Sequence, residues 1–171
     1  DATIITTAVP DIAHTLNIAP VKMSLAVAAY VLSVAIFIPV SGWFADRFGA
    51  RRIFVAALAV FTIGSMLCGL ANSFAMLVAM RVLQGLGGAM MTPVGRLILL
   101  RSFPRSELMT AMTYMTIPAI VGPLIGPLFG GLLTTALSWR WIFYVNLPFG
   151  LLGIGLAIRF IKNMPDANVA R

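Results

Sequence analysis

The sequence has few of the residues that enzymes and metal sites use. Its 171 residues include one cysteine (Cys68), one histidine (His14) and five acidic residues. One cysteine excludes a disulfide framework, and one cysteine with one histidine excludes a Cys/His zinc cluster. A Ser/His/Asp set or a carboxylate pair also cannot be assembled convincingly from so few groups. The sequence therefore predicts a protein that is not an enzyme and holds no metal.

Charge is also scarce. Charged residues make up 10% of the chain, and hydrophobic residues make up 60%. A soluble domain has about 25% charged residues, and a disordered segment is poor in Leu, Ile, Val and Phe, so neither class fits. A bilayer span needs about 20 apolar residues, and the chain contains several apolar runs of that length. We expect an all-α integral membrane protein.

The apolar runs define the predicted helices. Five long runs cover 23–44, 53–71, 74–100, 109–137 and 141–161. The first run, 1–10, covers only about 14 Å at 1.5 Å per residue, which is under half of a ~30 Å hydrocarbon core. We expect it to be the second half of a helix that begins outside this sequence, so that the chain is a fragment with six helices. Short connections make successive helices antiparallel.

The basic residues lie mostly on one side of this topology. Nine of the twelve lie at the ends of, or after, the second, fourth and sixth helices, whereas Lys22 and Arg140 lie on the other side and Arg81 falls deep inside a span. The positive-inside rule makes the side with nine charges cytoplasmic. The net charge of +7 is spread over loop ends and forms no single patch, so no nucleic-acid partner is expected.

Arg81 is the most informative charge. It lies about seven residues into the fourth predicted helix, roughly 10 Å deep, where an arginine costs at least ~2.5 kcal/mol and should face a cavity or a partner. Asp1 is the acidic residue that the topology places at a similar depth. The two form either a proton-coupling pair, in which protonation of Asp1 releases Arg81, or a buried ion pair that fixes helix packing. We favour the first interpretation.

Small and aromatic residues suggest packing roles. Gln84 lies on the same helical face as Arg81 and could bind Arg81 or a substrate. Gly85 and Ala89 form a small-xxx-small pattern typical of close helix packing. Trp139 and Trp141 lie at a predicted span boundary, where we expect them to anchor at lipid headgroups.

A glycine- and arginine-rich motif joins the second and third helices. Gly42 would let helices approach, and Gly49 would permit a turn with positive φ. Asp46 could accept hydrogen bonds from Arg47 or Arg51, or from a helix N-terminus. Anchoring charge explains arginines here, but it does not explain the order Gly-x-x-x-Asp-Arg-x-Gly.

This segment resembles the loop signature of the major facilitator superfamily, G-x-L-A-D-R-x-G-R-K/R, with Phe44 and Ala50 at the positions that differ. Four further segments are similar to family motifs in the family's order. They are Asp1–Pro10 (L-D-x-T-I-V-N-V-A-L-P), Leu77–Ala89 (L-x-x-x-R-x-x-Q-G-x-G-A-A), Gly122–Gly131 (the antiporter motif) and Trp139–Gly150. The last segment is most like the fourteen-helix drug:proton antiporter branch (EmrB/QacA type, HsrA-like).

The resemblance implies an N-terminal six-helix bundle of two three-helix inverted repeats, with a C-terminal half as its partner. It implies a cytoplasmic latch, a proton-transfer role for Arg81 and a kinked fifth helix. The residues that would form the latch motif are Gly42, Asp46, Arg47, Gly49, Arg51 and Arg52. The residues that would form the antiporter motif are Gly122, Gly126, Pro127, Gly130 and Gly131. Pro127 removes a backbone donor, so a bend is expected there.

The expected function is proton-coupled export of amphipathic, often cationic compounds across a bacterial inner membrane by alternating access. The proton gradient supplies the energy and no cofactor is expected. Met and aromatic side chains near mid-span suit such ligands. The candidate pocket residues are Tyr30, Gln84, Met112, Tyr114, Met115 and Asn146. A metabolite or siderophore exporter and a non-transporting receptor or scaffold remain alternatives.

Overall fold

The computed structural model describes residues 2–161, which form a helical bundle. Asp1 lies outside the described residues, as do 162–171. Helices account for every regular element within the described part. They are α1 (Ala2–Thr15), η1 (Pro20–Lys22), α2 (Met23–Phe48), α3 (Ala50–Gly69), α4 (Phe74–Ser102), α5 (Leu108–Ala136), α6 (Trp141–Tyr144) and α7 (Asn146–Phe160).

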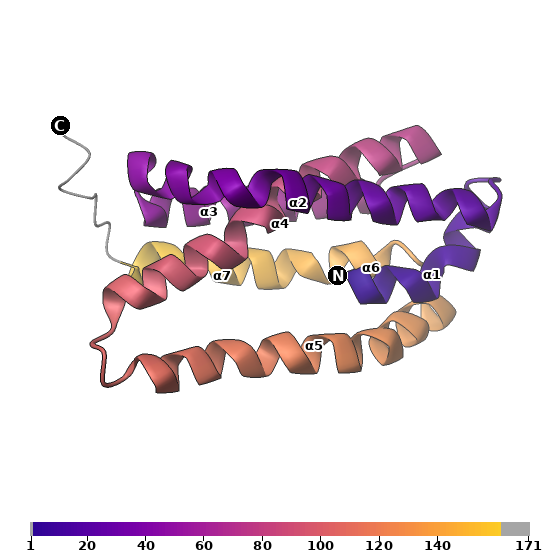
Figure 1. The fold of residues 1–171 in the computed structure, drawn as a ribbon. Coiled ribbons are helices and arrows are strands. Elements are labelled where there is room, and N and C mark those ends of the chain that lie inside the picture. The colour runs from indigo at the N-terminus through magenta and orange to yellow at the C-terminus, as the bar shows by residue number, and fades with distance from the viewer. Residues whose placement is uncertain (1, 162–171) are drawn as a thin grey trace.

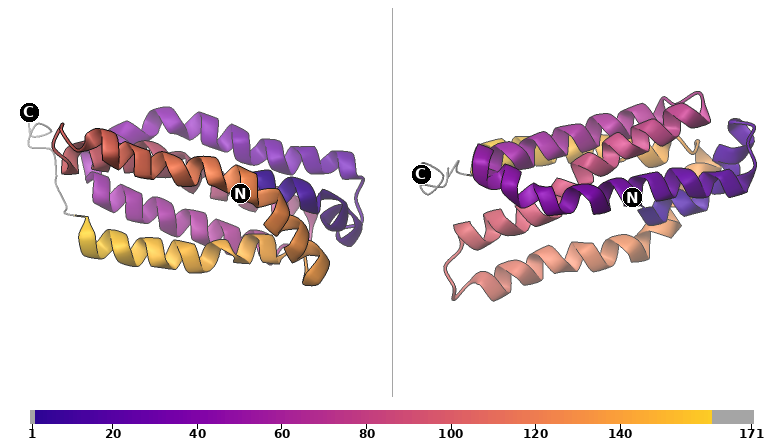
Figure 2. Two further views of the ribbon diagram at one scale, coloured as in Figure 1. Left: turned by 90° about the horizontal axis from the view of Figure 1, so that it is seen from below. Right: turned by 45° about the horizontal axis from the view of Figure 1, so that its top comes forward.

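The long helices run along one common direction and alternate in sense (Figure 1). The α2–α3 and α4–α5 connections lie at one end of the bundle, which we call the Asp46 end. The α1–α2, α3–α4 and α5–α6 connections lie at the other end, which we call the Arg140 end. α4 runs obliquely across the bundle, from α3 at the Arg140 end toward α5 at the Asp46 end (Figures 1 and 2).

Five helical segments of the described chain are long and apolar enough to cross a membrane. They run over 20–48, 50–69, 74–102, 108–136 and 141–160. Many large apolar side chains on their outer faces are exposed, among them Leu124, Leu128 and Phe149. Such apolar outer surfaces suit a lipid environment, in which the exposed side chains contact hydrocarbon instead of water.

Two helix boundaries differ from those that we expected. α1 continues through Pro10 to Thr15, whereas the sequence predicted an end at Pro10, because a helix can bend around a proline when neighbouring helices hold it. The expected helix 141–161 is interrupted at Val145. Pro148 has no N–H to donate to the carbonyl of Tyr144, which explains the break between α6 and α7.

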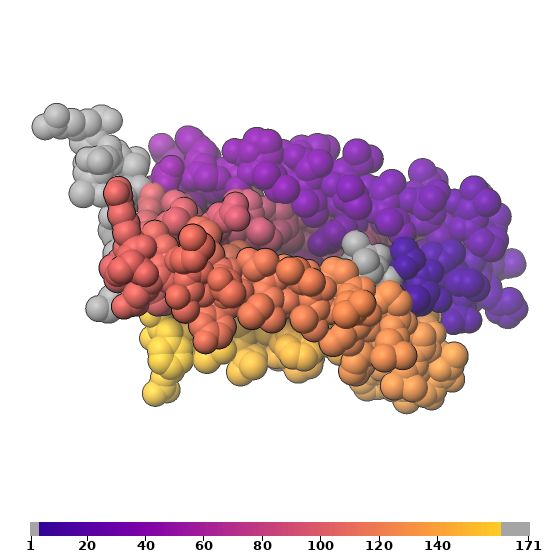
Figure 3. Space-filling model, turned by 60° about the horizontal axis from the view of Figure 1, so that its bottom comes forward, coloured from indigo at the N-terminus to yellow at the C-terminus, as the bar shows by residue number. Residues whose placement is uncertain are grey.

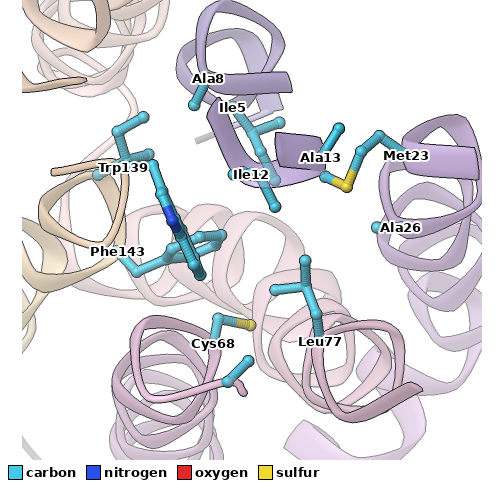
Figure 4. Close-up of a cluster of buried hydrophobic side chains, with 12 residues drawn as sticks. Ile5, Ala8, Ile12, Ala13, Met23, Ala26, Cys68, Leu77, Trp139 and Phe143 are labelled. Carbon is cyan, nitrogen blue, oxygen red and sulfur yellow. The ribbon is translucent and has the colours of Figure 1, made fainter. Parts of the chain in front are cut away.

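The main core lies toward the Arg140 end, where α1, α6 and the adjoining ends of α3 and α4 meet, and Figure 4 shows its side chains. Ile5 and Ile12 of α1 meet Cys68 of α3, Leu77 of α4 and Phe143 of α6 there, and all five side chains are fully buried. Trp139 also belongs to this core and is only 3% exposed, so our expectation of a headgroup anchor is wrong for it. Its ring packs edge-on against Phe143, at 6.2 Å between centroids. Trp141 is 48% exposed.

α5 lies on the outside of the bundle, where it forms much of one face (Figure 3). It packs mainly on α1, and only Gly126 and Gly130 of its residues are buried. It is a continuous helix although it contains Pro118, Pro123 and Pro127. The sequence predicted a kink at Pro127. The helix is not interrupted there, and the C-terminal part of α5 turns away from the line of its first part (Figure 2, left).

Candidate functional site

Arg81 of α4 lies in the interior of the bundle and is completely buried. It is seven residues after Phe74, the first residue of α4, which corresponds to a depth of about 10 Å along the helix. Its Nη1 donates to Oε1 of Gln84 at 2.7 Å, and its Nε donates to the carbonyl oxygen of Ala26 at 3.5 Å. A buried guanidinium requires such partners, because an unsatisfied charge in an apolar interior is very costly.

Tyr30 of α2 provides an aromatic face for this guanidinium. The Cζ atom of Arg81 lies 4.2 Å from the centre of the Tyr30 ring, well within the range of a cation–π interaction. The α4 backbone leaves room for the ring, since a Cβ atom at Gly88 would lie only 2.9 Å from the Tyr30 hydroxyl oxygen. The absence of a side chain at position 88 therefore allows the tyrosine to stand beside Arg81.

Gln84 is also fully buried and links Arg81 to α3. Its Oε1 accepts from Arg81 and lies 3.8 Å from Sγ of Cys68. Its Nε2 donor makes no hydrogen bond to any described residue. A buried donor without a partner costs about 1–3 kcal/mol, so this amide is a candidate contact for a ligand that enters the site.

Close contacts between helix backbones hold α4 in place around Arg81. A Cβ atom at Gly85 would lie 2.7 Å from the carbonyl oxygen of Tyr30, and one at Gly87 would lie 2.5 Å from the backbone nitrogen of Phe61. Ser33 of α2 adds a hydrogen bond from its hydroxyl to the carbonyl of Val82, at 2.7 Å. α4 is thus packed directly against both α2 and α3, as the small-residue pattern predicted.

Asp46 and Arg101 form an ion pair at the Asp46 end of the bundle. Nη2 of Arg101 in α4 donates to Oδ1 of Asp46 in α2 at 3.0 Å, and the two side chains are 27% and 50% exposed. The sequence suggested Arg47 or Arg51 as the partner. Instead, Arg47 lies over the ring of Trp43, with its Cζ 5.6 Å from the ring centre, and Arg51 donates to the carbonyl of Ile158.

The other residues of this loop motif differ in how far they match our expectations. Gly49 has a φ of 91°, which favours glycine because a side chain would be strained there. A Cβ atom at Gly42 would meet nothing within 4 Å, so the expected close helix approach at Gly42 is wrong. Arg52 is exposed at the start of α3.

The glycine motif of α5 is divided between two environments. Gly126 is buried, and a Cβ atom at Gly130 would lie 2.5 Å from Oγ1 of Thr7 in α1. In contrast, a Cβ atom at Gly122 or Gly131 would meet nothing within 4 Å, and Pro127 is exposed. Gly130 therefore seats α5 on α1, Gly126 is buried within the bundle, and Gly122 and Gly131 leave parts of the α5 backbone uncovered.

The structure places the six pocket candidates in different regions. Tyr30 and Gln84 contact Arg81. Asn146 instead donates to Oγ of Ser65 at 2.9 Å, and Ser65 donates to the carbonyl of Phe143 at 2.8 Å. The remaining three, Met112, Tyr114 and Met115, lie on α5. Tyr114 is 73% exposed and lines a groove of about 360 Å3 with Leu99 and Phe103.

Sequence reasoning missed three residues that connect helices, namely Ser33, Ser65 and, at the Asp46 end, Arg101. The two serines lie within apolar helices, where an unsatisfied hydroxyl is unfavourable, so they were detectable as hydrogen-bonding contacts between helices. Arg101 was counted only as one of many loop charges. Among the described residues, no group of three or more His, Cys, Asp or Glu side chains could hold a metal ion.

Residues 1–170 match the family model described as Major Facilitator Superfamily. Among curated proteins, the chain is 48% identical over 163 residues to the MdtD multidrug resistance protein of Cronobacter sakazakii (strain ATCC BAA-894). It is 50% identical over 163 residues to that of Salmonella newport (strain SL254). Each alignment covers 95% of this chain and 35% of the relative, so the chain spans about a third of the length of these relatives.

The family match covers nearly the whole chain, and the helical bundle with its span-length helices agrees with it. The chain belongs to the major facilitator superfamily, a family of multi-pass membrane transporters and not of enzymes.

Proposed function

We propose that this chain is the N-terminal bundle of a proton-coupled exporter of amphipathic, often cationic compounds. The observation that most supports this proposal is the fully buried Arg81, with Gln84 and Tyr30 in contact with it. Intramembrane ionisable residues are expensive and mark ion or substrate pathways. The names of the MdtD relatives add support for drug export.

Asp1 is the acid that we propose to carry the proton. It precedes α1 and lies outside the described residues, so the pairing with Arg81 rests on the sequence. When Asp1 binds a proton, it no longer neutralises Arg81, and the guanidinium then repels a cationic substrate that binds near it. Proton entry and substrate release are coupled in this way, with no cofactor other than the proton gradient.

The wider architecture that we propose follows the family resemblance. The bundle works with a C-terminal half of the same transporter, as the paired repeats of such transporters require. The complete protein has the fourteen-helix arrangement of the EmrB/QacA branch. It lies in a bacterial inner membrane with the Asp46 end in the cytoplasm, because the basic connections gather at that end.

Fluorescent-dye transport in inverted membrane vesicles tests the proposal. The complete transporter that contains this chain should accumulate a cationic dye when a pH gradient is imposed, and collapse of the gradient should stop the accumulation. Asp1→Asn should abolish the dependence on the gradient. Equal gradient-driven transport by Asp1→Asn and the wild type would refute the proton pair, and absence of transport across a broad panel of compounds would refute export.

A further inference from the structure

A groove lies between α3 and α7 at the Asp46 end of the bundle, away from Arg81. Its volume is about 450 Å3. Its lining combines two basic side chains with four apolar ones. The lining residues are Arg51, Arg52, Val55, Ala56, Ala59 and Ile158.

A hydrogen bond between two of these lining residues joins α3 to α7. Nη2 of Arg51 donates to the carbonyl of Ile158. This carbonyl lies in the last turn of α7, where carbonyl groups have no donor within the helix. The bond therefore gives this carbonyl a donor and fixes the Arg51 guanidinium at the groove. The other N–H groups of Arg51 are then oriented before any ligand binds.

No acidic side chain among the lining residues neutralises the positive charge of Arg51 and Arg52. Arg52 follows Arg51 on the exposed surface of α3. The acidic residues in the described part of the chain are Asp11, Asp46 and Glu107, and none of them lines the groove. The site thus presents two positive charges to whatever occupies it.

The groove has the polarity of a membrane boundary. Arg52 and Ala59 are seven residues apart on α3, which is about 10 Å along the helix. The arginines are at the end of the span, and Val55, Ala56 and Ala59 extend from them toward the bilayer interior. A ligand that fits must combine a negative group at the boundary with an apolar tail along the helices.

We infer that this groove binds an anionic phospholipid. The phosphate lies at Arg51 and Arg52, and one acyl chain lies on Val55, Ala56 and Ala59 against Ile158. Basic pockets between membrane helices are known to hold lipid headgroups. A lipid with net negative charge is favoured over a zwitterionic one, because two cationic side chains face the headgroup and no acidic side chain of the lining could hold its ammonium. This inference does not depend on the proposed transport function.

The thermal unfolding midpoint of the complete transporter in neutral detergent provides the test. Phosphatidylglycerol should raise the midpoint in a saturable way, and phosphatidylcholine with the same chains should not. Arg52→Gln should weaken the apparent affinity for phosphatidylglycerol about fivefold, the effect of losing one basic contact at a charged headgroup. Arg105→Gln is the matched control, since Arg105 is exposed at the same end but lies outside the groove.

A second pair of variants tests the apolar part of the groove. Ala59→Trp should fill the groove and abolish the lipid effect, whereas Ile36→Trp on the exposed face of α2 should preserve it. The midpoint without lipid shows whether each variant folds. The inference is overturned if both lipids act alike, if Arg105→Gln weakens binding as much as Arg52→Gln, or if inorganic phosphate alone reproduces the stabilisation.

Discussion

The ring of Tyr30 and the guanidinium of Arg81 face one another across the α2–α4 contact, 4.2 Å from ring centre to Cζ. The arginine is fully buried, so water does not solvate its charge. The tyrosine ring contributes to stabilising that charge instead. This interaction depends on α4 as much as on α2, because Gly88 leaves the space that the tyrosine hydroxyl occupies.

Two substitutions of Tyr30 should distinguish the contribution of its ring to transport from that of its hydroxyl. Tyr30→Phe retains the aromatic face, so gradient-driven dye transport should stay within about threefold of the wild type. Tyr30→Leu removes a desolvated cation–π interaction of about 2 kcal/mol, and transport should fall at least tenfold. Vesicle assays normalised to the amount of transporter in the membrane measure both. Similar transport by the Leu and Phe variants would show that the ring face does not matter.

The contact between α3 and α4 should tolerate no side chain at Gly87. A Cβ atom there would lie 2.5 Å from the nitrogen of Phe61 and 2.7 Å from the carbonyl oxygen of Ala57, and neither backbone atom can move away alone. Gly87→Ala should therefore destabilise the bundle by about 1–3 kcal/mol. Gly155→Ala is the matched control, because its Cβ would meet nothing within 4 Å. Thermal unfolding in detergent compares them, and equal midpoints would contradict the close contact.

The Asp46–Arg101 pair should matter more for transport than for stability. Both side chains are partly exposed, and such pairs contribute about 0–1 kcal/mol. Asp46→Asn should hence leave the unfolding midpoint nearly unchanged, but it should reduce dye transport if the pair acts as a latch. The charge swap Asp46→Arg with Arg101→Asp should recover part of the transport. A large loss of membrane-inserted protein in Asp46→Asn would instead make the residue structural.

Arg140 should hold the end of α3. Its Nε donates to the carbonyl of Gly69 at 2.9 Å, and its Nη2 donates to the carbonyl of Ala71 at 3.2 Å. Its guanidinium also stacks on Trp139, 4.7 Å from the ring centre. Arg140→Gln should cost about 1.5 kcal/mol, the lower range for charged hydrogen bonds in a half-exposed position. Amide hydrogen exchange at residues 70–73 should accelerate, and unchanged exchange would exclude this role.

The sequence predicted the helices well because apolar runs of span length leave few alternatives. It could not predict the partner of Asp46, since several arginines lie nearby in sequence and the one that pairs with it, Arg101, is 55 residues away. It also could not distinguish the two tryptophans of the α5–α6 connection. Trp139 turns into the core and Trp141 turns outward, a choice made by the turn geometry and the packing of Phe143.

The candidate site was partly predictable for a similar reason. Arg81 and Gln84 are three residues apart, so one helical face brings them together. Tyr30 joins them only through the packing of α2 on α4, which a single sequence does not specify. Met112, Tyr114 and Met115 were chosen by residue type and expected depth alone. These residues lie on the outer helix α5, and where they lie relative to Arg81 depends on how α5 packs on α1.

The glycine contacts of α4 also determine how the bundle can deform. Backbone atoms of α4 touch α2 at Gly85 and α3 at Gly87 with no side chain between them, so no flexible layer exists in which α4 could slide past either neighbour. Spin labels or fluorophores on α2, α3 and α4 would keep constant mutual distances through any working cycle. Arg81 would accordingly travel with three helices as one rigid body.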